Sequence, residues 1–295
     1  MEIGGTYPML YAFFDEAGRL RREANARQIE AAIRAGASGV AVLGLGSEVH
    51  KLGRNERRSL LEWTLDDVNG RVPVGATIAD GNIPDMIESA RHARSAGAAW
   101  LILQPPRPPA SAADLIDFFG AVADSVDCPV AIQNAPEFLG IGLSADDLLA
   151  LNQAHRNVVA VKAESTALTV AGIVEKLRGR MRVLNGRAGF ELVDNLRAGV
   201  DGMIPGTETI DLQVAIERAM RAGDEAKAAE LYRKLLPALA FVMQGLSTFL
   251  LYGKLIAAAR LGLTPSQNRI PSEAATPMGQ DWARRFAAEL GPLPA

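Results

Sequence analysis

The stretch Ala96-Gly97-Ala98, with the apolar segment 100–103 just after it, joins the end of a predicted helix to the start of a predicted strand. Glycine is typical of the position that ends a helix, and a short apolar segment bounded by such a signal is typical of a buried strand. The same pattern recurs at Ala35-Gly36-Ala37 and at Ala198-Gly199-Val200. The recurrence predicts a chain built from repeated helix-to-strand units.

Eight apolar segments occur in total, and each is followed by a loop and then by a stretch with helical spacing. Because the segments are apolar on both faces, we expect parallel strands covered on both sides by helices. The predicted strands are 9–14, 39–43, 72–78, 100–103, 129–132, 158–161, 181–184 and 202–204. The predicted helices are 25–35, 54–69, 83–95, 111–125, 144–154, 166–178, 188–198 and 210–222.

Repeated βα units without a dinucleotide-binding glycine fingerprint after the first strand predict a closed (β/α)8 TIM barrel of the α/β class. Residues 1–222 would form this catalytic barrel. Residues 223–295 are predicted to form a C-terminal helical extension, with helices near 224–236, 237–262 and 279–290. Its long apolar faces favour packing on the barrel or on a neighbouring subunit.

Composition excludes several function classes. Apolar residues make up 48% of the 295 positions and charged residues 22%, which is typical of a globular chain with a full core. The formal net charge of -3 argues against nucleic acid or an anionic membrane as a partner. The chain has no signal-peptide pattern at its start and no long apolar run, so we expect a cytoplasmic protein without a membrane partner.

Metal and disulfide chemistry are not expected. Cys128 is the only cysteine, and its place at a helix-to-strand joint favours a structural role. His50, His92 and His155 are scattered along the chain, so they predict no metal site.

In a TIM barrel the residues just after each strand form the active site. Lys162 is the residue of most interest there, because it continues the apolar segment 158–161 and is one of only six lysines. Burial disfavours an ammonium, and a neutral amine can attack a carbonyl to form a Schiff base. The alternative is a strand-end lysine that reaches solvent or pairs with Glu48 or Glu164.

Several motifs resemble the dihydrodipicolinate synthase and N-acetylneuraminate lyase family along nearly the whole chain. They are Gly44-Leu45-Gly46-Ser47-Glu48 with Leu52 and Glu56-Arg57, Gln104-Pro105-Pro106, the segment 129–136, and the segment 158–165 containing Lys162. The resemblance implies a (β/α)8 enzyme with a helical tail, in which Lys162 forms the Schiff base. It also implies that Gly46 and Ser47 hold the carboxylate of a 2-keto acid. Because the lysine serves as electron sink, no cofactor is expected.

Departures from the family pattern narrow the expected activity. The family's strand 5 tyrosine, a proton shuttle, is replaced by Gln133, whose amide does no acid or base chemistry near neutral pH. Leu45 or Gly46 replaces the synthases' relay threonine, Arg107 stands at a relay tyrosine, and Phe138 takes the place of a carboxylate-binding arginine. These changes argue against the lysine-biosynthetic reaction.

The motifs Gln133-Asn134-Ala135-Pro136 and Lys162-Ala163-Glu164-Ser165 are instead similar to the branch that dehydrates 2-keto-3-deoxy sugar acids, such as 2-keto-3-deoxy-L-arabonate dehydratase. We therefore expect a Schiff-base lyase, with a hydro-lyase favoured over an aldolase, in which Glu48, Ser47, Gln133 or Glu164 orients or protonates the leaving hydroxyl. The predicted catalytic residues are Lys162, Gln133 and Glu164. The predicted substrate-binding residues are Gly46, Ser47, Glu48, Arg107, Asn134, Gly186 and Ile204.

Each residue also has a plainer interpretation. In this interpretation Glu48 merely caps backbone amides, Gln133 and Asn134 bridge strand ends, and Arg107 is a solvated rim residue.

Three other functions stay open. One is a pyruvate-dependent aldolase of the same family, and another is a catalytically silent relative that binds a keto acid. The third is a phosphate-binding barrel, because glycines follow the seventh and eighth predicted strands at 185–189 and 205–207. The family resemblance implies a homotetramer, a dimer of dimers, whose partner besides itself is a small 2-keto acid.

Overall fold

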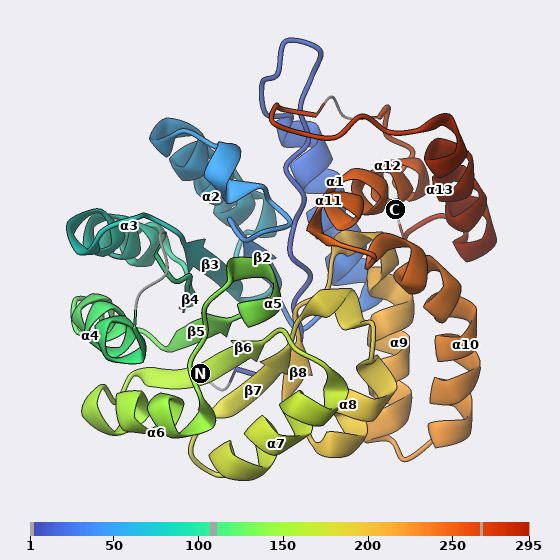
Figure 1. Cartoon of the computed structure of the whole chain (residues 1–295). Helices are drawn as coiled ribbons and strands as arrows, with labels where there is room; N and C mark the ends of the chain where they lie inside the picture. Colours follow the sequence, from blue (N-terminus) through green and yellow to red (C-terminus); the bar gives the residue numbers. More distant parts are fainter. Residues whose placement is uncertain (1–2, 107–110, 266–267, 295) are drawn as a thin grey trace.

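The computed structural model describes residues 3–106, 111–265 and 268–294. The described residues contain eight parallel strands in the order β1-β8-β7-β6-β5-β4-β3-β2 (Figure 1). The predicted TIM barrel is therefore confirmed. The strands are β1 (Gly5–Thr6), β2 (Val40–Val42), β3 (Val74–Ile78), β4 (Trp100–Leu103), β5 (Val130–Asn134), β6 (Val158–Ala163), β7 (Arg182–Asn185) and β8 (Gly202–Met203).

Met9 closes the barrel between its first and last strands. It forms parallel bridges to Ala41 on one side and to Gly206 on the other. Backbone hydrogen bonds from Leu10 N to Ala41 O and from Ala41 N to Pro8 O, both 2.9 Å, continue the closure toward β2. The ring of strands is thus complete although β1 is only two residues long.

The prediction of the first strand at 9–14 was wrong. β1 is Gly5–Thr6, where Gly5 pairs with Gly202. The apolar residues after Met9 are buried for another reason: Tyr11 and Phe13 pack against Ala24 and Ala257, which lie on helices. The segment is apolar because it is enclosed by helices, and its composition alone could not distinguish this from a place in the sheet.

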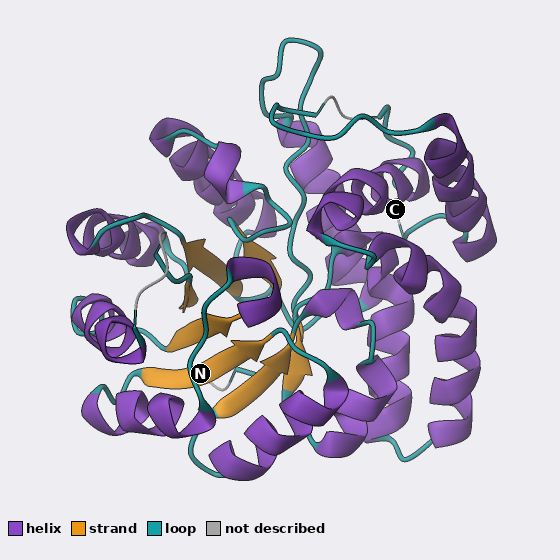
Figure 2. Cartoon of the chain, in the orientation of Figure 1, coloured by secondary structure: helices purple, strands orange, loops and turns teal. Residues whose placement is uncertain are grey.

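Helices alternate with the strands and cover the outside of the barrel (Figure 2). They are α1 (Arg22–Ala35), α2 (Arg54–Val68), α3 (Ile83–Ala96), α4 (Ala112–Ala123), α6 (Ala145–Ala154), α7 (Ala167–Leu177), α8 (Leu192–Ala198) and α9 (Ile210–Arg221). The predicted glycine ends are confirmed, since Gly36, Gly97 and Gly199 end α1, α3 and α8 in the left-handed conformation. A short helix, α5 (Pro136–Leu139), follows β5 and was not predicted.

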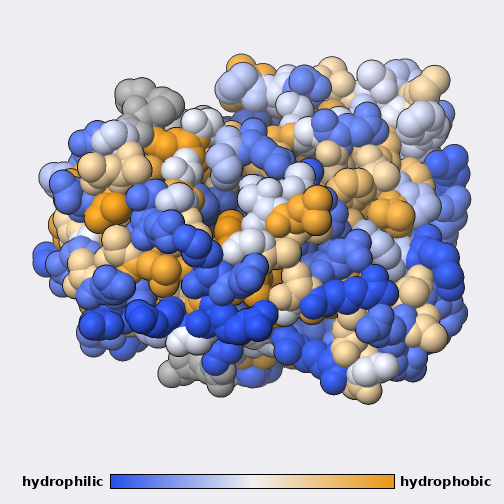
Figure 3. Space-filling model, turned by 60° about the horizontal axis from the view of Figure 1, so that its bottom comes forward, coloured by the Kyte–Doolittle hydropathy of each residue, from blue (hydrophilic) through white to orange (hydrophobic). Residues whose placement is uncertain are grey.

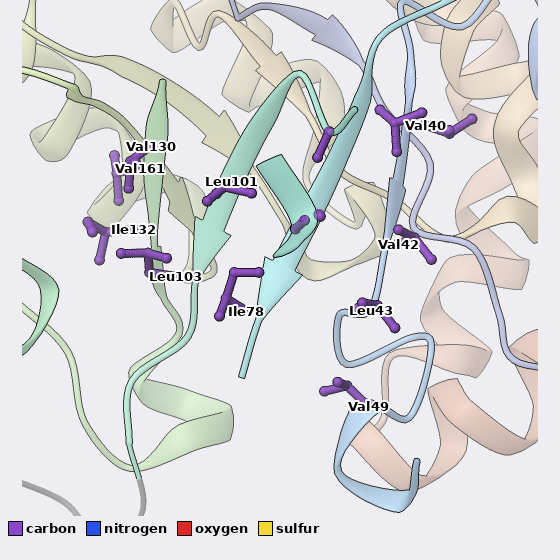
Figure 4. Packing of buried hydrophobic residues seen from close by; sticks show 14 of the residues in the cluster. Val40, Val42, Leu43, Val49, Ile78, Leu101, Leu103, Val130, Ile132 and Val161 are labelled. Carbon is purple, nitrogen blue, oxygen red and sulfur yellow. The ribbon is translucent and has the colours of Figure 1, made fainter. Parts of the chain in front are cut away.

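Side chains alternate between the two faces of each strand. Leu101, Leu103 and Ile132 belong to the core between barrel and helices, part of which Figure 4 shows. Trp100 and Ile102, on the same strand as the first two, belong to a separate cluster inside the barrel. This alternation fixes which residues point inward at the carboxyl ends of the strands.

The C-terminal helices differ from the predicted ones at their central break. Helix α10 (Glu225–Val242) runs through Pro237, where a break was predicted, and stops instead just before Gly245. Next come α11 (Leu246–Thr248), a π-helical turn (Phe249–Gly253) and α12 (Lys254–Arg260), and α13 (Pro277–Leu290) is the last helix. These helices share an apolar core with α8 and α9 on one side of the barrel.

Two further features bear on the expectations above. Within the described residues no single helix is long and apolar enough to cross a bilayer. Helix α10 and the segment 246–260 have the required length and apolarity only when taken together, and the chain bends by 110° between them. No three His, Cys, Asp or Glu side chains in the described part of the chain converge as a metal site would require.

On the face drawn in Figure 3 hydrophilic residues predominate, with apolar residues between them.

Candidate active site

Lys162 and Gln133 lie side by side at the carboxyl ends of β6 and β5. The register pairs them directly, and Ala131 and Ala160, two residues earlier on each strand, belong to the cluster inside the barrel. Because residues two apart share a face, Lys162 and Gln133 also point inward, and so does Glu164 just beyond β6. The strand alternation alone therefore brings an amine, an amide and a carboxylate together.

These side chains form a continuous hydrogen-bonded chain. Lys162 Nζ lies 2.6 Å from Glu164 Oε1, and Gln133 Nε2 donates to the same oxygen at 2.8 Å. Gln104, directly after β4, donates from its Nε2 to Gln133 Oε1 at 3.1 Å. Lys162 and Glu164 are each only 5% exposed, so this ion pair is almost fully removed from water. A buried ion pair needs further hydrogen bonds, and the Gln133 amide supplies one to Glu164, while Gln104 holds Gln133 in turn.

The position of Glu164 is fixed by close backbone packing. Its N–H donates to Asn134 O at 2.9 Å. A Cβ added at Gly186, after β7, would lie 2.3 Å from Glu164 Cγ. Glycine is therefore required at 186 for the carboxylate to lie where it does.

A cavity opens beside Lys162 and Glu164. The space in it is about 30 Å³, enough for one or two water molecules. A sugar acid therefore needs the surrounding side chains to move before it can enter. The wall consists of Met9, Leu45, Gly46, Phe138, Arg187, Ala188, Ile204, Pro205, Met243, Leu246 and Phe249.

The comparison with family models decides the family. The model of the dihydrodipicolinate synthetase family matches residues 2–281. The chain belongs to this family. Members of the family are lyases, so the chain is placed in that enzyme class.

Some relatives are named as aldolases of 2-dehydro-3-deoxy sugar acids and others as 4-hydroxy-tetrahydrodipicolinate synthases. YagE of Escherichia coli K12, a putative 2-dehydro-3-deoxy-D-gluconate aldolase, is 31% identical over 238 residues, 79% of each chain. A 4-hydroxy-tetrahydrodipicolinate synthase of Agrobacterium fabrum is 32% identical over 79% of this chain and 80% of its own. The crystal structure of YagE in complex with pyruvate has 27% identity and a TM-score of 0.90, over 97% of this chain and 98% of that one.

Gly186 does not line the Lys162 cavity but lies against Glu164, which does. Of the predicted substrate-binding residues, Gly46 and Ile204 line this cavity. Ser47 does not, because its hydroxyl donates to Leu10 O at 2.6 Å and accepts from Leu43 N at 3.0 Å. Leu43 has a positive φ of 66°, so Ser47 holds this unusual backbone turn beneath the cavity.

Glu48 and Asn134 are also engaged elsewhere. Glu48 is paired with the ammonium groups of Lys51 and Lys254 and does not line the Lys162 cavity. Burial alone would raise the pKa of Glu48, but the two lysines outweigh burial and lower it. Asn134 donates to Leu143 O at 2.9 Å and accepts from Leu143 N at 2.8 Å, which ties β5 to the loop after α5. Arg107 lies outside the described residues.

Arg187 is a wall residue that the list of predicted site residues lacked. It has a positive φ of 50°, and Ala188 after it has one of 51°, so helix α8 begins at 192 and not at 188 as predicted. The guanidinium lies 2.8 Å from Glu191 and 3.5 Å from Glu137. The atom nearest Glu137 is Arg187 Nε, which is buried and makes no hydrogen bond among the described residues, so it can donate to a ligand.

The glycine segments considered for phosphate are already occupied by protein groups. A Cβ at Gly206 would lie 2.1 Å from Glu208 Oε2, so a carboxylate fills the space beside this glycine. At the other segment, Gln213 donates to Ala188 O at 2.7 Å and takes the space beside Gly189. A neighbouring carboxylate disfavours an anion, so the structure gives the phosphate-binding alternative no support.

Proposed function

We propose that this chain is a class I lyase that forms a Schiff base between Lys162 and C2 of a 2-keto acid, and that it dehydrates a 2-keto-3-deoxy sugar acid. The observation that carries the proposal is the 2.6 Å contact between Lys162 Nζ and Glu164 Oε1 in the wall of a cavity at the carboxyl ends of the strands. An amine and a carboxylate in contact supply a nucleophile and a proton acceptor together.

In the proposed reaction the Lys162 ammonium first passes a proton to Glu164, and the neutral amine attacks the C2 carbonyl. Glu164 returns this proton to the carbinolamine hydroxyl, which leaves as water and gives an iminium that acidifies the protons on C3. The Glu164 carboxylate then takes one C3 proton to give the enamine. The C4–O bond breaks, and the departing hydroxyl receives that proton from Glu164 and leaves as water. Hydrolysis of the unsaturated iminium frees the Lys162 amine.

Gln133 supports dehydration in this proposal by holding Glu164 in place. Its amide transfers no protons near neutral pH, and no tyrosine is among the described residues that line the cavity. Glu164 is therefore the group available for proton transfer beside Lys162. It can reach both C3 and the C4 hydroxyl, because these are attached to adjacent atoms of the substrate.

An aldolase acting on the same class of substrate is the second candidate. It is favoured by the names of two relatives, since YagE is a putative 2-dehydro-3-deoxy-D-gluconate aldolase and YjhH, 28% identical, a probable 2-dehydro-3-deoxy-D-pentonate aldolase. Aldol cleavage breaks C3–C4 instead of C4–O and releases pyruvate and an aldehyde. A silent keto-acid-binding relative would form the Schiff base and release no product.

Borohydride reduction with a panel of 2-keto acids, followed by peptide mass analysis, tests the proposal. We expect the reduced adduct on Lys162, with 2-keto-3-deoxy sugar acids preferred. Product analysis without borohydride then separates the candidates: a dehydrated keto acid supports dehydration, and pyruvate plus aldehyde supports the aldolase. An adduct on another lysine, or none with any acid in the panel, overturns the proposal.

We further propose that the chain works in the cytoplasm as a homotetramer. The family to which the chain belongs carries the proposal of a tetramer. The exposed apolar side chain of Leu168, at the start of α7, is ordinary for a single surface residue and does not decide it. Light scattering checks this, and a monomer of 31.4 kDa would contradict it.

A further inference from the structure

A second cavity lies next to the Lys162 cavity. It is enclosed by the 3-10 turn Val49–Lys51, the segment 246–251 and the loop 271–273, and its volume is about 180 Å³. An engineered cavity of about 150 Å³ holds benzene, so this one has room for about six non-hydrogen atoms. Its wall includes Glu48, Lys51, Leu246, Leu250, Leu251 and Pro271.

The polar side of this cavity carries more positive than negative buried charge. Glu48 accepts from Lys51 Nζ at 2.6 Å and also pairs with Lys254 Nζ. Glu48 and Lys254 are each 2% exposed, and the Lys51 side chain is 9% exposed. Two ammonium groups thus share one carboxylate out of contact with water, and an uncompensated buried charge is costly.

The other charged groups nearby do not remove this excess. Arg269, which lies over the Phe14 ring, is paired with Glu56 and so forms a neutral pair of its own. Glu273 lines the cavity but its side chain is exposed to water, and His50 also lies at the wall. Burial, followed by the nearness of Lys51, lowers the pKa of Lys254, although Glu48 opposes this, so the cluster is under electrostatic stress.

Lys51 has a donor left for a ligand. Its ammonium carries three N–H groups, and the described partners are Glu48 Oε2 and Arg269 O, the latter at 3.0 Å. Opposite this side, Leu246, Leu250 and Leu251 present an apolar wall. The cavity therefore combines a cationic donor with an apolar surface, and the neutral polar residues Ser247, Asn268 and Ser272 also line it.

We propose that this second cavity binds a small monocarboxylate with a short apolar tail. The carboxylate would pair with Lys51 and neutralise the excess charge, while the tail would contact the three leucines. Leu246 lines both this cavity and the Lys162 cavity, so a bound carboxylate lies one side chain away from the candidate active site. The site would be distinct from the substrate site, because Glu48 and Lys51 do not line the latter.

Butyrate is the probe, because it has six non-hydrogen atoms and lacks the ketone that reacts with Lys162. Calorimetric titration or ligand-observed NMR measures its binding to the full chain. We expect saturable binding to the wild type and to Lys162→Met alike, and at least tenfold weaker binding to Lys51→Met. Lys51→Met leaves Glu48 and Lys254 as a one-to-one pair, so this variant should fold.

Leu250→Phe gives an independent variant that fills the cavity and keeps the charges, and it should also weaken butyrate at least tenfold. Butylammonium, with the same tail and opposite charge, should not bind, and inorganic phosphate, without a tail, should bind more weakly than butyrate. The proposal is overturned if butyrate binding is lost in Lys162→Met, is unchanged in Lys51→Met or Leu250→Phe, or is absent from the wild type. Equal binding of phosphate or butylammonium would overturn it as well.

Discussion

Lys162 Nζ and Glu164 Oε1 lie 2.6 Å apart inside the barrel, although their residues are separated by only one position in sequence. The alternation of a strand explains this, since Lys162 and Glu164 share the inward face and Ala163 between them belongs to the outer core. The amine that we propose as nucleophile is thus in contact with a proton acceptor.

Glu164→Gln keeps the size of the side chain and removes its ability to accept a proton. We expect kcat to fall by about 10² to 10⁴, the usual contribution of a positioned acid or base, and slower borohydride trapping at Lys162. Steady-state kinetics on the substrate found by trapping measures this. Glu175→Gln, which changes an exposed carboxylate on α7, is the matched control and should behave as wild type. Wild-type turnover in Glu164→Gln would remove Glu164 from the mechanism.

Gly186→Ala tests the contact through packing alone. The added methyl group would lie 2.3 Å from Glu164 Cγ, and Gly186 has a φ of -102°, outside the left-handed region that favours glycine. The carboxylate must therefore move away from Lys162, and we expect kcat/KM to fall at least tenfold, about 1.4 kcal/mol.

The control for this variant is Gly172→Ala on α7, where nothing lies within 4 Å of the new methyl group. It should keep wild-type activity and gain up to about 1 kcal/mol of stability, because alanine is the better helix former. Equal activity of Gly186→Ala and Gly172→Ala would show that the position of Glu164 is unimportant.

Gln104 is predicted to be a positioning residue that acts through Gln133. Its amide donates to Gln133 Oε1 at 3.1 Å and so turns Gln133 Nε2 toward Glu164. Gln104→Leu should lower kcat about fivefold, the equivalent of one neutral hydrogen bond, with little change in KM. Gln104→Asn should not restore it, because the shorter side chain cannot reach. A rise in KM with unchanged kcat would instead indicate that Gln104 contacts the substrate.

The residues of the proposed reacting centre could be grouped from the sequence because each ends or directly follows one of two neighbouring strands. Lys162 and Glu164 follow one apolar strand, and Gln133 ends the neighbouring one, so strand periodicity was sufficient to group them. The pairing of Glu48 with Lys254 was not predicted, because the two residues are 206 positions apart and local patterns carry no information about such a pair. The wall residues Met243, Leu246 and Phe249 come from the C-terminal helices, whose path depends on a break that composition put at Pro237.

Arg187 is predicted to contact the hydroxylated end of the substrate. Glu137 and Glu191 already neutralise its charge, so the group suits neutral hydroxyls better than a second acidic group. Its Nε lies 3.5 Å from Glu137 but makes no hydrogen bond among the described residues, so it can donate to a hydroxyl. Arg187→Met should lower kcat/KM for a 2-keto-3-deoxy sugar acid about 10- to 100-fold, while borohydride trapping of pyruvate stays near wild type. Equal loss for both compounds would mean that Arg187 supports the fold and not substrate recognition.

Glu208 predicts an unusual dependence of stability on pH. The side chain is fully buried behind Gly206, accepts from Tyr11 Oη at 2.9 Å, and has no partner for Oε1 among the described residues. Burial raises its pKa to about 7, whereas an exposed glutamate has a pKa near 4.5. Between these values the folded chain keeps a proton that the unfolded chain has lost. The contribution of Glu208 is therefore fully present below pH 4.5 and is lost as the pH rises toward 7.

Above pH 7 the cost of the buried charge is on the order of 3 kcal/mol. Glu208→Gln removes the titration and keeps an acceptor for Tyr11, so its melting temperature should lie several degrees above that of the wild type at pH 8, with the gap closing by pH 5. Thermal unfolding across this range measures the difference, with Glu175→Gln again as control. Parallel curves for Glu208→Gln and wild type would mean that Glu208 carries the same charge in both states of the chain throughout this range.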